Sequence, residues 1–300
     1  MVAFFLTLNF MKIRDFTLGI AFALIWSSAF TSARISMFDA PPFLLLSLRF
    51  LISGIIAIGL AHIIGQSIQF SRSEWYAILV FGVFQNTIYL GLNFVAMQWI
   101  DASLAATIAS ILPLIITIFL WLFFKEKLST VGLLGLVIGL TGLILIIKAS
   151  VPDKLNAIGI VLCFLGVISL SIATIIVRNS SGKNMLMLIG LQMLVGSITL
   201  FPLSIGFETW EINWTNRLIV SFIYTIIFPG LTATLIWFKL LHFIGPIKAA
   251  SFHFLNPFFG VLIAHVVLSE QLESQQLVGV LLVTVAILSI QLSKMTKNSI

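Results

Sequence analysis

Long uncharged apolar runs, separated by short polar connections, make up most of this 300-residue chain. A helix needs about 20 apolar residues to cross the roughly 30 Å hydrocarbon core of a bilayer, and the runs reach that length. The composition agrees, because 60% of the residues are hydrophobic, only 9% are charged and the mean hydropathy is +1.18. Water-soluble globular proteins lie far from these values. The sequence therefore predicts an all-α membrane protein.

Ten transmembrane helices result when the chain is divided at charges, prolines and polar clusters. The connections between them are too short to hold a soluble domain. The predicted helices cover residues 16–35, 42–64, 75–98, 102–124, 131–147, 157–177, 185–207, 218–241, 246–268 and 277–292.

Lysine and arginine are distributed unevenly between the two sides of this predicted bundle. With the N-terminus in the cytoplasm, eleven of these cations lie on the cytoplasmic side and four lie outside, while Arg49 lies within a span. Cytoplasmic connections retain positive charge because its translocation is disfavoured. We therefore expect a multi-pass protein of the bacterial inner membrane, surrounded by lipid, with both termini in the cytoplasm.

Cysteine content and charge distribution argue against several kinds of site. Cys163 is the only cysteine, so we expect no disulfide, no metal site and no cofactor. The net charge of +6 is scattered over many connections, so we expect no nucleic acid partner. Residues 1–10 lack the charged leading region of a signal peptide, and we expect an over-extended start instead.

A shift of 144 positions aligns the second half of the chain with the first. The matched pairs are Pro113 with Pro257, Glu126 with Glu270, Leu128 with Leu272 and Gly135 with Gly279. Each copy holds five spans, an odd number, so the second copy must cross the membrane upside down. We expect two inverted five-helix repeats, residues 16–148 and 157–294. A chance likeness between apolar helices is the alternative.

Several of these residues form motifs that resemble a known family. The motifs are Trp26-Ser27-Ser28-Ala29-Phe30, Arg49-Phe50, Pro113 followed by Glu126-Lys127-Leu128, and Pro257 followed by Glu270-Gln271-Leu272. Together they resemble the EamA type of the drug/metabolite transporter superfamily over nearly the whole chain. The resemblance implies a central cavity lined mainly by spans one, three, four, six, eight and nine. It also implies export or exchange of amino acids and other small metabolites.

The ten carboxylates all fall in connections or at the ends of predicted spans. Proton relays and cation sites within a membrane usually need a buried Asp or Glu. An embedded hydrolase would need a cluster of acids, histidines or metal ligands at depth, and the histidines are dispersed. We therefore expect no enzyme, and predict transport of a neutral or zwitterionic solute by facilitated movement or exchange.

Span three carries the strongest polar pattern in the chain. Gln85, Tyr89 and Asn93 recur at intervals of four residues, with Asn86 beside them. They share one helical face, and in hydrocarbon these groups must find partners. The face therefore points into the bundle or a wet cavity. Hydrogen bonding between helices and a solute-binding wall both remain open.

Three prolines lie within predicted spans and are candidate hinges. Pro113 and Pro257 fall near the middle of spans four and nine, and Pro229 falls in span eight. A proline inside a helix removes a hydrogen bond and kinks the chain. Transporters built from inverted repeats bind substrate near such midplane breaks. A packing kink without contact to solute is the alternative.

Polar residues close to these prolines are candidate substrate contacts. Ser110 and Asn256 lie within one turn of Pro113 and Pro257. His253 and His265 share span nine, and a histidine could replace the missing acid as a proton carrier. His253 is the better candidate because it is nearer the midplane, although a packing role is the alternative.

Aromatic residues are too numerous to be informative singly, but Trp26 and Phe30 lie one turn apart within the first motif. The resemblance places their helix at the cavity, so we interpret both as lining the substrate path. Trp237, near the cytoplasmic end of span eight, is assigned to the interfacial aromatic belt.

Arg49 and two glutamates are assigned structural roles. Arg49 can snorkel outward or pair with a loop acid such as Asp39, although capture of a substrate carboxylate is a second interpretation. We favour the structural role because the resemblance puts span two behind the cavity. Glu126 and Glu270 recur at equivalent ends, which indicates capping or loop anchoring.

These features predict a small-molecule transporter, foremost an amino-acid exporter working by alternating access through a midplane cavity and functional as a monomer. Two alternatives remain. The same scaffold could carry a nucleoside-like or vitamin-like metabolite, or it could be a lipid-handling or scaffold protein without transport.

Overall fold

The computed structural model describes residues 13–125, 130–150, 154–177, 184–271 and 274–297, and this part of the chain is helical without strands. Seven helical stretches are long and apolar enough to cross a membrane. They correspond to predicted spans one to four and six to eight. Shorter apolar helices at Thr130–Gly142, Asn256–Leu268 and Leu277–Ala286 lie in the other three predicted spans. The protein is thus a multi-pass helical bundle, and ten complete spans remain a prediction.

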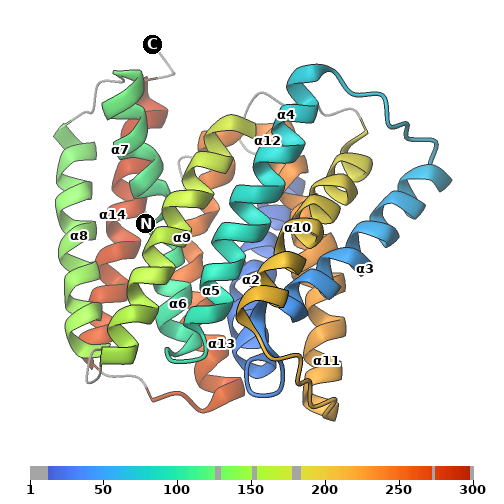
Figure 1. Ribbon diagram of the computed structural model, residues 1–300. Coiled ribbons are helices and arrows are strands. Elements are labelled where there is room, and N and C mark those ends of the chain that lie inside the picture. Colours follow the sequence, from blue (N-terminus) through green and yellow to red (C-terminus); the bar gives the residue numbers. More distant parts are fainter. Residues whose placement is uncertain (1–12, 126–129, 151–153, 178–183, 272–273, 298–300) are drawn as a thin grey trace.

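The helices are named in chain order (Figure 1). Those of the first half are α2 (Ile13–Ser36), α3 (Pro42–Ile63), α4 (Arg72–Phe81), η1 (Gly82–Tyr89), α5 (Leu90–Ala96), α6 (Ala102–Ala109), α7 (Leu112–Phe124) and α8 (Thr130–Ser150). Those of the second half are α9 (Lys154–Val177), α10 (Met185–Phe207), α11 (Asn216–Thr225), η2 (Ile226–Ala233), α12 (Thr234–Ser251), η3 (Phe252–Leu255), α13 (Asn256–Leu268) and α14 (Ser274–Lys297).

The boundaries of these elements recur with the same offset as the sequence. α4, η1 and α7 begin and end 144 residues before α11, η2 and α13. Both η1 and η2 are π-helices. Lys125 and Ser269, also 144 apart, adopt left-handed backbone conformations with φ of 53° and 56°. Irregular backbone therefore occurs at matching places in both halves, and the inverted orientation of the halves remains a prediction.

Two helices begin earlier than predicted because polar residues cap them. Ser71 accepts a hydrogen bond from the Glu74 amide, and the Glu74 carboxylate accepts one from the Ser71 amide. This capping box starts α4 at Arg72 instead of residue 75. Thr215 caps α11 by accepting from the Leu218 amide, so that helix begins at Asn216.

The predicted connection at residues 242–245 is wrong. α12 continues to Ser251, and the irregular turn is η3 at Phe252–Leu255. The Gly245-Pro246 pair indicates a break in an aqueous protein. Within a membrane bundle, neighbouring groups can satisfy the backbone that a proline frees, so such a pair does not have to end a helix.

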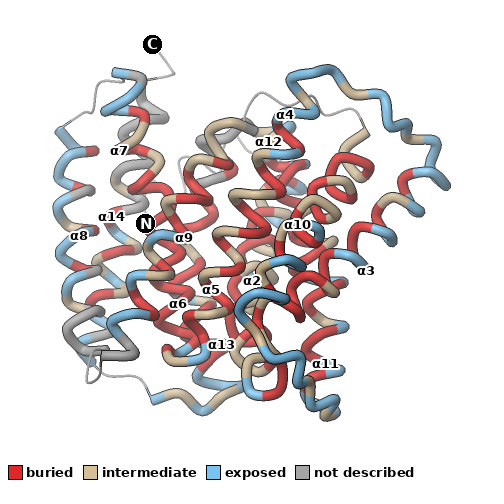
Figure 2. Tube along the Cα trace, in the orientation of Figure 1, coloured by how far each residue is buried: buried red, intermediate tan, exposed pale blue. Residues whose placement is uncertain are grey.

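Burial follows the expected pattern of a bundle, with buried positions facing inward and exposed apolar ones facing outward (Figure 2). α8 and α14 pack at one edge of Figure 1, and α3 lies at the opposite edge. The α8–α14 contact is close, since a Cβ at Gly142 would lie 2.8 Å from the Gly279 oxygen. Small residues permit this approach in membrane helices. The segments η1, η2 and η3 lie between these edges and meet around a cavity.

Candidate functional site

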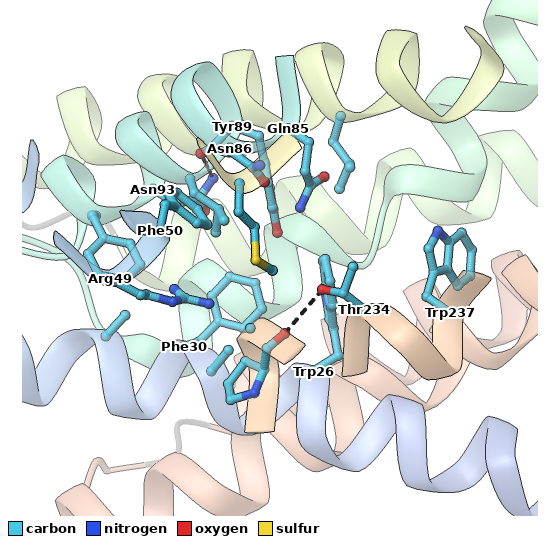
Figure 3. Close-up of a pocket in the computed structure, with 18 of the residues that line it drawn as sticks. Trp26, Phe30, Arg49, Phe50, Gln85, Asn86, Tyr89, Asn93, Thr234 and Trp237 are labelled. Atoms are coloured by element: carbon cyan, nitrogen blue, oxygen red, sulfur yellow. Dashed lines mark hydrogen bonds between the residues drawn. The ribbon is translucent and has the colours of Figure 1, made fainter. Parts of the chain in front are cut away.

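A cavity lies inside the bundle between α2, α3, η1, α5, η2 and α12 (Figure 3). Its free volume is about 50 Å³, room for a few water molecules and less than the roughly 300–1,000 Å³ of most small-molecule sites, so the cavity is narrow in this conformation. The predicted residues that line it are Trp26, Phe30, Arg49, Gln85, Asn86, Tyr89, Asn93, Pro229 and His253. Among the described residues, no Asp or Glu belongs to the lining. Ser110, Pro113, Asn256, Pro257 and Glu270 do not line it, and Glu126 lies outside the described residues.

The polar face of span three contributes both bundle contacts and free acceptors. The Asn93 amide nitrogen donates to the Tyr89 carbonyl at 2.8 Å, and that of Asn86 donates to the Gln192 carbonyl at 2.9 Å. The oxygens Asn93 Oδ1 and Gln85 Oε1 are buried and have no partner among the described residues. The side-chain nitrogens of Asn86 and Asn93 thus donate to backbone carbonyls within the bundle, while the oxygens of Gln85 and Asn93 accept no hydrogen bond from the described residues.

An aromatic wall closes another side of the cavity. The Trp26 and Tyr89 rings are nearly parallel, at 6° with centroids 6.5 Å apart. Phe22 stacks on Trp237 at 5.0 Å, and the His253 ring lies edge-on to both tryptophans. The assignment of Trp237 to the interfacial belt is therefore wrong, because it is 7% exposed and lines the cavity. The packing of α2 against α12 places Trp237 inside the bundle.

His253 connects this wall to the start of α13. Its Nδ1 lies 2.8 Å from Asn256 Nδ2, and its Nε2 is buried without a described partner. The Ser27 hydroxyl donates to the Asn256 carbonyl at 3.3 Å. Asn256 therefore orients the histidine ring and ties α13 to α2, while His253 itself faces the cavity.

Two of the three candidate hinge prolines stand at helix starts and not inside helices. Pro113 and Pro257 fall in the first turns of α7 and α13, where a missing amide hydrogen loses no intrahelical bond. The breaks themselves fall just before, at residues 110–111 and in η3. Ser110 bonds to Ala106 of its own helix at 2.7 Å. Pro229 lies within η2, and its carbonyl accepts the Thr234 hydroxyl shown in Figure 3.

Arg49 does not pair with Asp39. The Asp39 carboxylate instead accepts from Arg217 at 2.5 and 2.8 Å and from the Thr215 hydroxyl at 2.7 Å. Arg49 is 4% exposed and lines the cavity, so the position behind the cavity expected for it is wrong. The position of Arg49 on α3 directs its side chain into the bundle, between α2 and η2.

The Asp39 contacts give a pH-dependent link between the α2–α3 connection and α11. Hydrogen bonds from Arg217 and Thr215 lower the pKa of Asp39 from 3.8 to about 2. A lowered pKa contributes stability above the ordinary value, and this contribution is lost as pH falls through about 2. The unfolding temperature of Asp39→Asn should therefore stay below that of the native protein from about pH 5 to 8, and the difference should shrink as the pH falls from about 4 to about 2. Convergence already near neutral pH would contradict the assignment.

Glu270 anchors the connection after α13 to the start of α6. Its carboxylate accepts from the amides of Ala102 and Ser103 at 2.9 and 3.1 Å. Glu208 does the same for α3, accepting from Phe43 and Leu44. A carboxylate at a helix N-terminus satisfies free amides and complements the helix dipole.

Glu270→Gln should destabilise the protein by about 1 kcal/mol, because the amide has one acceptor oxygen and no charge to offer the α6 amides. Thermal unfolding of the purified protein would measure this change. Glu211→Gln, at an exposed position, is the matched control and should have no effect. Equal effects of the two substitutions would contradict a capping role.

The cavity also contains residues that were not predicted as site residues. They are chiefly Phe22, Phe50, Met193, Thr234 and Trp237. Phe22 precedes Trp26 by one helical turn, so extending that face would have found it. The others come from α3, α10 and α12, and their sequences carry no signal that distinguishes them from packing residues.

Comparison with known proteins gives a consistent result. The profile of the EamA-like transporter family matches residues 16–148 and 157–292. The uncharacterized transporter YvbV of Bacillus subtilis is 24% identical over 88% of this chain and 87% of its own length. Protein PecM of Dickeya dadantii is also 24% identical, over 94% and 93%. A protein of known crystal structure shares the fold, with a TM-score of 0.70 at 17% identity over 95% of this chain and 99% of that one.

Proposed function

The chain belongs to the EamA-like transporter family, and from this premise we propose that it exports an amino acid through the cavity by alternating access. The observation that carries the proposal is the cavity's lining, in which unpartnered amide oxygens face an aromatic wall. Amide oxygens such as Asn93 Oδ1 accept hydrogen bonds from an ammonium group. The aromatic wall offers an apolar surface to a side chain.

The irregular segments supply the hinges for this cycle. In η1 and η2 the π-helical hydrogen bonding departs from the α-helical ladder, and π segments often mark functional sites. Both segments contribute to the cavity lining, so a change in their geometry would reshape it directly. The two repeats, residues 16–148 and 157–294, rock about these segments and about the breaks preceding Pro113 and Pro257.

The protein acts as a monomer in the bacterial inner membrane with both termini in the cytoplasm. The uneven distribution of lysine and arginine supports this orientation. Bacterial relatives that align with most of this chain and with most of their own length support the location.

Purified protein in proteoliposomes tests the proposal. Vesicles loaded with a mixture of the twenty amino acids, nucleosides and vitamins should release one or a few amino acids faster than protein-free vesicles. Release of nucleosides or vitamins alone would contradict amino-acid export and favour the ring-bearing class. The parallel Trp26 and Tyr89 rings are the observation that favours this second candidate. Flux of a nucleoside-like or vitamin-like solute should fall when either the Trp26 or the Tyr89 ring is removed, and it should persist in Asn93→Ala.

Coupling to protons is a separate expectation. No acid lines the described part of the cavity, so we expect collapse of the pH gradient to change the flux by less than about twofold. Measuring release with and without an ionophore that exchanges protons for potassium checks this. Strong inhibition would contradict this expectation and assign proton coupling.

A further inference from the structure

Arg49 is a buried cation without a counter-charge among the described residues. It is 4% exposed, its Nε is buried without a hydrogen-bond partner, and no described carboxylate forms an ion pair with it. Phe50 is its aromatic neighbour, with the ring centroid 5.3 Å from the guanidinium carbon. Arginine keeps its charge in proteins, so neutralisation cannot relieve this burial.

Among the described residues, no acid lies in the lining beside the guanidinium. A Cβ built at Gly230 of η2 would lie 3.8 Å from Arg49 Nη2 and 3.3 Å from the Ser53 hydroxyl. That hydroxyl is itself buried without a described partner. Figure 3 shows the guanidinium pointing into the cavity beside Phe30. The nearest carboxylate in the sequence, Asp39, is held by Arg217.

The depth of Arg49 argues against a role at the membrane surface. It is the eighth residue of α3, which places it roughly 10 Å along the helix at 1.5 Å per residue. A snorkelling arginine extends toward the interface, whereas this one enters the cavity. An ionisable residue that is buried within a membrane bundle and has no partner in the described chain indicates a binding site for an ion of opposite charge.

We propose that Arg49 binds the carboxylate of the transported solute, and that the substrate class is carboxylates. The planar guanidinium donates two parallel hydrogen bonds to a carboxylate. Since no acid in the described lining pairs with an ammonium group, the amine has only neutral acceptors such as Asn93 Oδ1, and the carboxylate makes the one charge-paired contact. The inference rests on the proposed function and narrows it, because α-amino acids then share the site with their deaminated analogues.

Matched probes test the proposal on the purified native protein. The series is L-phenylalanine, 3-phenylpropanoate without the amine, L-phenylalaninamide without the carboxylate and phenethylamine, with the leucine series alongside. Thermal-shift titration should give apparent affinities for both acids at least about tenfold tighter than for the amide and the amine, equivalent to about 1.4 kcal/mol. Equal binding of acid and amide overturns the proposal.

Variants separate ligand binding from structure. In Arg49→Gln the ratio of acid to amide affinity should fall to about one, and Arg49→Lys should keep part of it. The ligand-free unfolding temperature of Arg49→Gln should equal or exceed that of the native protein, because an unpaired buried charge is removed. Arg72→Gln, at an exposed position, is the control for loss of one cation and should keep the native ratio. An unchanged ratio in Arg49→Gln, or a large fall in ligand-free stability, overturns the proposal.

The proteoliposome flux distinguishes failure of the Arg49 carboxylate site from failure of the proposed amino-acid export. Amino-acid flux that is unaffected by Arg49→Gln refutes the Arg49 site and leaves amino-acid export standing. With 3-phenylpropanoate added to the vesicle load, flux of this acid without flux of any amino acid supports the Arg49 site and refutes amino-acid export. Flux of nucleosides alone refutes both. The absence of any flux and any thermal shift across the panel refutes both as well.

Discussion

Replacing Gly196 with alanine is expected to destabilise the protein by about 3 kcal/mol and to reduce transport at least tenfold. Gly196 lies on α10 against η1, and a Cβ there would sit 2.5 Å from Asn86 Cβ. Asn86 cannot retreat without losing its hydrogen bond to the Gln192 carbonyl. Since η1 carries the polar side of the cavity, displacing it also displaces Gln85 and Tyr89.

The same helix supplies the control. A Cβ at Gly206 would meet no atom within 4 Å, so Gly206→Ala should leave both stability and transport near their native values. Thermal unfolding and proteoliposome flux measure the two effects together. If Gly196→Ala behaved like Gly206→Ala, α10 would not hold η1 in place as the structure indicates.

Replacing Trp26 with alanine is expected to weaken substrate binding roughly tenfold to a hundredfold, from the loss of about 1.5–3 kcal/mol of buried apolar contact. Its ring lies parallel to Tyr89 and edge-on to His253, so it forms the centre of the aromatic wall. Flux measured over a range of substrate concentrations should show a raised KM.

Two further variants test whether the raised KM of Trp26→Ala is specific to the cavity. Trp26→Phe retains an aromatic face and should recover much of the affinity. Trp121→Ala removes a tryptophan that is 49% exposed on α7 and lies outside the cavity, and its KM should be native. A KM that is raised in Trp121→Ala but not in Trp26→Ala, or that is native in both of these variants, would refute the aromatic wall as a substrate surface.

Part of the cavity could be predicted because some residues are anomalous for their surroundings. Amides and a phenol in an apolar span must face a partner or a cavity, which identified Gln85, Tyr89 and Asn93. Trp237 carried no such signal, since an aromatic residue suits the interface as well as the interior. Its position was decided by Phe22, which lies 215 residues away in sequence and stacks on it.

The role of Arg49 illustrates the same limit for charges. Sequence position made Asp39 its natural partner, but Asp39 lies against Arg217, 178 residues away. Ion pairs between distant segments depend on how helices pack, and no local pattern encodes that choice. The π-helical geometry of η1 and η2 was also missed, because their sequences do not differ in kind from those of ordinary helices.

The sequence by itself determined that the chain is helical, membrane-embedded and repeated after 144 residues. Hydrophobic length and capping are local properties, and a bilayer requires each span to satisfy its own backbone hydrogen bonds. Tertiary structure alone decided which side chains meet, because membrane helices associate through close packing of specific small and polar residues. That packing leaves Arg49 facing the cavity without an ion-pair partner in the described part of the chain, and it gathers Trp26, Tyr89 and His253 around the cavity.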